Sequence, residues 1–147
     1  MATMKRLGVA CDHAGYPLKE AVKAHLQQAG YEVRDFGTNS TESVDYPDYA
    51  HPLADAVDCG ELEGGITLCG SGNGISMVAN KHQGVRAAIC WNEEITRLAR
   101  QHNNANVCSL PARYLSEQQA LKIVDIFFTT GFDGGRHEKR VSKIPVK

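Results

Sequence analysis

The chain has 147 residues, and its 16 Lys and Arg nearly balance its 17 Asp and Glu, for a formal net charge of -1. This length suits one compact domain with its own core, so we expect a single domain over residues 1–147. The near-neutral balance argues against a protein that binds nucleic acid by bulk electrostatic attraction. No apolar run approaches the roughly 18 residues that span a bilayer, so no membrane association is expected.

Short apolar runs alternate with helical patterns along the chain, as they do in βαβ units. In chain order, the sequence predicts strand 7–11, helix 17–29, strand 32–36, a helical pattern at 49–57, strand 65–69, helix 75–81, strand 85–91, helix 93–101, strand 106–110 and a last long helix. Pro52 falls inside the second helical pattern, so that helix either starts late or is kinked. Ser116 and Gln119 have the spacing of a capping box that opens the last helix.

Five strands that alternate with helices predict a Rossmann-like three-layer α/β/α fold with a five-stranded parallel sheet. In such open sheets, ligands bind beyond the carboxyl ends of the strands. The residues that follow the first, third, fourth and fifth predicted strands are therefore the first candidates for a functional site.

The segment 69–76 (CGSGNGIS) follows the third predicted strand. Its alternating glycines allow backbone N–H groups to turn inward, and a helix follows, so the loop can hold an oxyanion or a phosphate. A thiol at its mouth would have a lowered pKa, because amide dipoles favour the thiolate. Cys69 is then either a reactive thiol or simply a small buried strand residue. The loop lacks the third glycine of a dinucleotide fingerprint, the Lys of a Walker A motif and the Arg of a cysteine phosphatase.

Further polar residues lie at predicted element ends. Asp12 and His13 follow the first strand and are either functional or a helix cap with its neighbour. His102 ends the fourth helix, where it is structural or acts as a general acid or base. Arg136 and Arg140 are four apart, a spacing that on a helix puts both on one face to hold a phosphate, unless they form a solvated tail. No metal-ligand spacing is present.

The five cysteines form no C-x-x-C pair and fit a reducing compartment rather than a disulfide framework or a zinc ribbon. The N-terminus lacks the apolar region of a signal peptide. We therefore expect a cytoplasmic protein.

Several motifs together resemble the type B ribose-5-phosphate isomerases, from about Arg6 to Ile144. They are CDHAGY at 11–16, DFGT at 35–38, SVDYPDYA at 43–50, CGSGNGIS at 69–76, ANK at 79–81, RQHNNANV at 100–107 and GGRHEKRV at 134–141. The resemblance implies an enzyme of the pentose phosphate pathway. It would interconvert ribose 5-phosphate and ribulose 5-phosphate through ring opening and an enediolate, without metal or cofactor.

The resemblance also implies a role for each site residue. Cys69 would move the proton between C2 and C1, and His102 would open the furanose ring. One subgroup of the family uses a glutamate where this chain has Ile75, which leaves Cys69 as the base. The expected substrate contacts are Asp12, His13, Gly70, Ser71, Gly72, Asn73, Gly74, Asn103, Arg113, Arg136 and Arg140. Segment 131–147, with five basic and two acidic residues, would supply part of the phosphate site.

Members of this family are homodimers or homotetramers whose active sites are shared between subunits. Pro111 stands where the family pattern has glycine, which leaves the approach of Arg113 open. Three alternatives to the main activity also stay open. They are an isomerase of a six-carbon sugar phosphate such as allose 6-phosphate, a non-catalytic sugar-phosphate sensor, and a cysteine hydrolase built on Cys69 and His102.

Overall fold

The computed structural model describes residues 4–146, which fold around one sheet of five parallel strands in the order β2-β1-β3-β5-β4. The strands are β1 (Arg6–Cys11), β2 (Glu32–Asp35), β3 (Gly64–Cys69), β4 (Ala87–Ile89) and β5 (Val107–Pro111). The helices are α1 (Tyr16–Gln28), α2 (Pro47–Asp58), α3 (Asn73–Ala79), α4 (Glu93–Gln101), α5 (Glu117–Thr129) and α6 (Arg136–Val141). The predicted α/β class with a five-stranded parallel sheet is confirmed.

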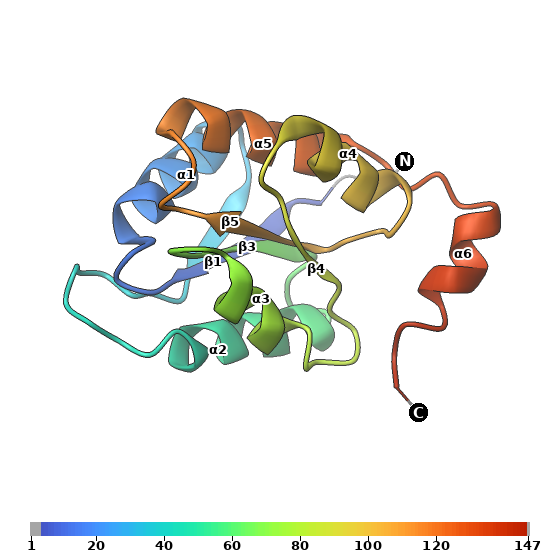
Figure 1. The fold of residues 1–147 in the computed structure, drawn as a ribbon, viewed down its shortest axis with the longest axis horizontal. Coiled ribbons are helices and arrows are strands. Elements are labelled where there is room, and N and C mark those ends of the chain that lie inside the picture. The colour runs from blue at the N-terminus through green and yellow to red at the C-terminus, as the bar shows by residue number, and fades with distance from the viewer. Residues whose placement is uncertain (1–3, 147) are drawn as a thin grey trace.

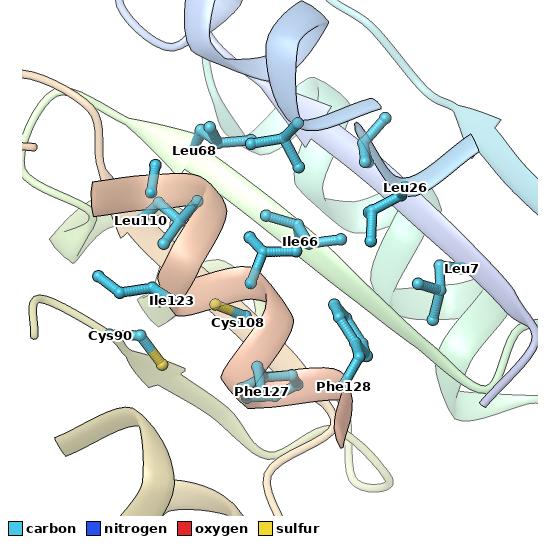
Figure 2. Packing of buried hydrophobic residues seen from close by; sticks show 14 of the residues in the cluster. Leu7, Leu26, Ile66, Leu68, Cys90, Cys108, Leu110, Ile123, Phe127 and Phe128 are labelled. Carbon is cyan, nitrogen blue, oxygen red and sulfur yellow. The ribbon is translucent and has the colours of Figure 1, made fainter. Parts of the chain in front are cut away.

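The helices cover both faces of the sheet, which gives three layers (Figure 1). Helices α1, α4 and α5 lie on one face, and α2 and α3 lie on the other. The first face holds the larger core cluster, in which leucine and isoleucine side chains of the sheet pack against Phe127 and Phe128 of α5 (Figure 2). The strands β1, β3 and β5 are almost wholly buried, as expected for central parallel strands covered on both faces.

Local signals set the helix ends. The capping box is present, because Ser116 Oγ accepts from the Gln119 backbone N–H while Gln119 Oε1 accepts from the Ser116 N–H. Asn92 caps α4 by accepting from the Ile95 N–H. Helix α2 begins at Pro47 and continues through Pro52, so of the two predicted alternatives, a late start or a kink, the late start is wrong. Its first turn accepts Pro47 because the N–H groups there have no helical partner.

Two elements differ from the prediction. Strand β4 has three residues, not the seven predicted, and at its start the Arg86 N–H donates to the Asn106 side chain and not to a neighbouring strand. Helix α6 was not among the predicted elements, and it lies beside the body of the domain within the C-terminal arm, residues 130–146 (Figure 1). Among residues 4–146, no helix is both long and apolar enough to cross a membrane.

Candidate active site

A cavity of about 350 Å³ lies at the carboxyl edge of the sheet, beyond the ends of β1, β3 and β5. Its volume matches that of small-ligand pockets. The residues that line it are Asp12, Tyr46, Cys69, Gly70, Ser71, Gly74, Arg113 and Tyr114. Five of the predicted substrate contacts and the predicted base therefore share one cavity at the edge where the topology places ligands.

Cys69 is the last residue of β3 and is held by the neighbouring strand. It pairs in register with Pro111, and its carbonyl accepts from the Ala112 N–H at 2.9 Å. The side chain lines the cavity with only 5% of the residue exposed. The thiol thus has a fixed position on a rigid strand and limited contact with bulk water.

Arg113 reaches the same cavity in spite of Pro111. Its N–H donates to the Gly70 carbonyl at 3.0 Å, and its guanidinium packs against the Gly70 backbone. Pro111 is tolerated because it ends the strand, where its nitrogen faces Gly72. The sequence left undecided whether Pro111 allows Arg113 to reach the site, and the structure shows that the guanidinium does enter the cavity.

The loop after Cys69 requires glycine at two positions. Gly72 has φ +78°, a left-handed conformation that side chains rarely adopt, and it precedes the first residue of α3. Gly74 packs against the Tyr46 ring so closely that an added Cβ would lie 2.5 Å from Tyr46 Cζ. The side chain of Ser71 accepts from the Asn73 N–H at 3.2 Å. The loop therefore needs Gly72 for its left-handed turn and Gly74 for the close packing of its backbone against Tyr46.

Asp12 and His13 are both anchored at the end of β1. Asp12 is buried and its Oδ1 accepts from the Gly15 N–H at 3.1 Å, so it does cap the turn before α1. His13 Nδ1 accepts from the Val44 N–H at 3.2 Å. Because Nδ1 accepts, the neutral ring carries its proton on Nε2, where it is a hydrogen-bond donor for a ligand oxygen.

The other predicted residues gather at the opposite edge of the sheet. His102 follows α4, which returns the chain to the amino end of β5, and the Asp133 N–H ties the C-terminal arm to the Gln101 carbonyl at 2.9 Å. The His102 ring stacks on His137 of α6, with centroids 4.2 Å apart and planes 11° from parallel. The same region holds Asn103, Arg136 and Arg140.

One chain therefore does not bring its own Cys69 and His102 together. Cys69 is level with Pro111 at the end of β5, whereas His102 precedes Val107 at its start. The four residue steps between Val107 and Pro111 alone span roughly 13 Å. The predicted site residues form two clusters, which we name the thiol cluster (Asp12, His13, 69–74 and Arg113) and the arm cluster (His102, Asn103, Arg136 and Arg140).

Sequence reasoning missed three residues that the structure places in these clusters. Tyr46 and Tyr114 line the cavity, and His137 stacks on His102. Tyr46 lies in the SVDYPDYA motif at 43–50, which is the signal that could have found it, but no periodicity or spacing distinguished it from other loop residues. His137 lies in the GGRHEKRV motif at 134–141, but its stacking on His102 depends on the path of the arm, which no local pattern encodes. Within residues 4–146, no group of three or more His, Cys, Asp or Glu side chains is arranged to hold a metal ion.

The fold and the cavity define an α/β protein with a buried thiol, a glycine loop and an arginine at one small-ligand site. Residues 7–144 match the profile of the family described as ribose/galactose isomerase, and the chain belongs to this family. It is 45% identical to ribose-5-phosphate isomerase B of Escherichia coli over 141 residues, which cover 96% of this chain and 95% of the relative.

Two solved structures show the same fold. A ribose 5-phosphate isomerase B from Thermotoga maritima superposes with a TM-score of 0.93 at 50% identity, over 96% of this chain and 97% of the other. The enzyme of that name from Mycoplasma genitalium, solved with bound ribulose-5-phosphate, superposes with a TM-score of 0.92 at 41% identity, over 97% of this chain and 95% of the other.

Proposed function

We propose that this protein is a ribose-5-phosphate isomerase that works without a cofactor. The observation that carries the proposal is the cavity in which Cys69, the glycine loop and Arg113 converge. The family supports it, as do relatives of the same length that are named for this reaction. The sugar phosphate held by the Mycoplasma genitalium protein supports a substrate of this class.

In the proposed reaction, ring opening comes first. His102 donates a proton to the ring oxygen of the furanose while solvent water takes the proton of the C1 hydroxyl, so that the C1–O4 bond breaks and the C1 aldehyde forms. The Cys69 thiolate then takes the C2 proton, which leaves an enediolate with its charge on O1. The O2 proton moves to O1, and the thiol returns a proton to C1 as the C2 carbonyl forms, which gives the ketose. The backbone N–H groups of residues 70–74 stabilise the enediolate oxygen, because fixed dipoles are most effective where charge develops.

Asp12 and His13 contact the sugar in this proposal, and Asn103, Arg113, Arg136 and Arg140 hold the substrate and its phosphate. Arginine suits this task because its planar guanidinium binds phosphate oxygens in pairs. Arg136 and Arg140 are one helical turn apart on α6, so both can face one phosphate.

We further propose that the working form is a homodimer in which the thiol cluster of one subunit meets the arm cluster of the other. The two clusters lie at opposite edges of each chain, so a second copy supplies what each cavity lacks. A two-fold arrangement of this kind creates two equal composite sites.

The free cysteines of the chain are consistent with work in the reducing cytoplasm.

Proton NMR tests the activity. Ribose 5-phosphate is incubated in D₂O with EDTA and either wild type, Cys69→Ala or the control Cys59→Ala, whose thiol is exposed and outside the cavity. Wild type and Cys59→Ala should form deuterated ribulose 5-phosphate, and Cys69→Ala should not. A wild type that leaves ribose 5-phosphate unchanged but converts allose 6-phosphate would overturn the five-carbon assignment. Saturable binding without turnover of either substrate would indicate a sensor.

Complementation tests the shared site. Cys69→Ala and His102→Ala are each expected to be inactive. When the two variants are produced together, half of the dimers are mixed and carry one intact site of two, so about one quarter of wild-type activity should return. If no activity returns although mixed dimers are detected by native mass spectrometry, each site is built from one chain and the proposed arrangement is wrong.

A further inference from the structure

The stacked pair of His102 and His137 joins two segments that are far apart in the sequence. His102 is the C-cap of α4, where its N–H donates to the Leu98 carbonyl at 2.9 Å. His137 lies in the first turn of α6, where its N–H donates to the Gly134 carbonyl at 3.1 Å. Each backbone is thus fixed by a hydrogen bond within its own segment. The two rings are nearly parallel, with centroids 4.2 Å apart, and join these two fixed segments.

The surroundings of His137 keep its ring neutral. Loss of hydration lowers its pKa, and the charges of His102, Arg136 and Arg140 lower it further, against an opposing effect of Asp133. These groups come from α4, from α6 and from the arm between α5 and α6. At neutral pH, His137 therefore offers an uncharged aromatic face to its neighbour.

A neutral aromatic face has two effects on the ring that it covers. It fixes the plane of that ring, because stacked rings tilt less freely than exposed ones. It also attracts the ring when it carries a positive charge, since the face of an aromatic ring is negative. A group that donates a proton needs both a fixed direction and a stable protonated form.

We propose that His137 is a positioning residue for ring opening, acting through its stacked contact with His102 and not through the substrate. The inference rests on the proposed function, because it takes His102 as the acid of that reaction. It assigns the C-terminal arm a role beyond phosphate binding, because the arm would also supply the ring that positions His102. The effect of His137 is confined to the step in which the furanose opens.

Ribulose 5-phosphate provides a test, because its C5 oxygen carries the phosphate and the ketose has no furanose form. Exchange of its C1 hydrogen in D₂O needs the thiol but no ring opening. Two rates are therefore measured by proton NMR for each variant: turnover of ribose 5-phosphate, and deuterium exchange at C1 of ribulose 5-phosphate. His137→Leu removes the aromatic face, and His137→Phe keeps it without a nitrogen.

His137→Leu should slow turnover of ribose 5-phosphate by about fivefold to tenfold and leave the exchange rate within about twofold of wild type. His137→Phe should keep both rates within about threefold. Equal loss of both rates in His137→Leu would overturn the inference, and so would a His137→Phe variant as slow as His137→Leu. Circular dichroism and elution volume show that each variant is folded and assembled.

The controls separate this inference from the proposed function. If wild type leaves ribose 5-phosphate unchanged, the proposed function fails and the inference fails with it. If wild type is active and His137→Leu matches it in both rates, only the inference fails. His102→Ala sets the scale, because it should lose turnover of the ring form and keep exchange at C1.

Discussion

The Lys19 ammonium lies 2.8 Å from Asp35 Oδ1, and the lysine is fully buried. Nζ also donates to Asn39 Oδ1 and to the Thr38 carbonyl, on the loop that follows β2. The Thr38 N–H in turn donates to the Cys11 carbonyl, one residue before Asp12. The buried ammonium therefore fixes the loop against the end of β1, next to the candidate site.

Removal of the carboxylate should be costly, because it leaves the buried Lys19 ammonium with only the more distant and more exposed Glu20 carboxylate, at 3.4 Å, as a counterion. Asp35→Asn is expected to lower the free energy of unfolding by about 3 kcal/mol, measured by urea denaturation. The matched control is Glu61→Gln, which breaks an exposed pair with Arg34 at 3.0 Å and should cost under about 0.5 kcal/mol. If both variants lose the same small amount, the buried pair does not stabilise the fold.

The same pair predicts a dependence on pH. Burial alone would raise the pKa of Asp35, but the hydrogen bonds from Lys19, Lys23 and the Gly37 N–H outweigh it and lower the pKa below its ordinary value. The stability that this carboxylate contributes is therefore complete above the ordinary pKa and is lost as the pH falls toward the lowered one. The difference in the free energy of unfolding between wild type and Asp35→Asn should therefore narrow below about pH 4. Urea denaturation at a series of pH values measures this difference.

The five thiols should react unequally with iodoacetamide. Burial raises the pKa of Cys11 to about 12, and burial together with Cys90 raises the pKa of Cys108 strongly, so both should stay protonated and unreactive at pH 8. Cys59 is exposed and should be alkylated without loss of activity. Cys69 should be alkylated with inactivation, and a substrate analogue should protect it.

Peptide mass spectrometry identifies the alkylated cysteines at each time point. Cys59→Ser is the control, and iodoacetamide should inactivate it at the same rate as wild type. Equal labelling of all five thiols with the activity intact would contradict the assignment of Cys69 as the base.

Gly74 and Tyr46 should be coupled. Gly74→Ala places a methyl group 2.5 Å from Tyr46 Cζ, so the ring must leave its position over the loop. We expect an activity loss of at least about tenfold, because small displacements of a site are costly. Gly74→Ala combined with Tyr46→Ala removes the clash, and its activity should exceed the product of the two single effects. Independent single effects would show that the clash is not what lowers the activity.

Arg140 should contribute mainly to binding of the phosphate. Arg140→Gln is expected to raise KM for ribose 5-phosphate by about tenfold or more with a smaller effect on kcat, since the phosphate does not react. The control is Lys122→Gln, because Lys122 pairs with Glu93 on the surface at 3.5 Å. An unchanged KM in steady-state kinetics would remove Arg140 from the phosphate site.

The central strands and the capped helices were predictable because their signals are local. An apolar run such as β3 indicates a buried strand by itself, and Ser116 and Gln119 meet within one turn. Strand β4 was predicted too long because its start depends on Asn106, twenty residues away from Arg86. The contact of His102 with His137 could not be predicted, since it depends on how the arm leaves α5.

For the site residues, too, some positions could be predicted from the sequence and others depend on distant contacts. The topology alone places Asp12 and Cys69 at one edge of the sheet, because both follow parallel strands. It also places His102 at the other edge, since α4 must return the chain to the start of β5. The cavity residues Tyr46 and Tyr114 come from loops, and loop paths are set by contacts that no periodicity records.

The strand order also sets a sequence of events during synthesis. Strand β4 pairs with β5 alone, yet it leaves the ribosome before β5 does. It therefore has no partner until residues 107–111 have emerged, and by then β3 must still be open on that side to accept β5. Non-local pairing of this kind slows folding and leaves edges exposed in the nascent chain. The last strand to be made thus joins the two halves of the sheet, and a chain that stops before it lacks both a closed sheet and the wall of the cavity that Arg113 supplies.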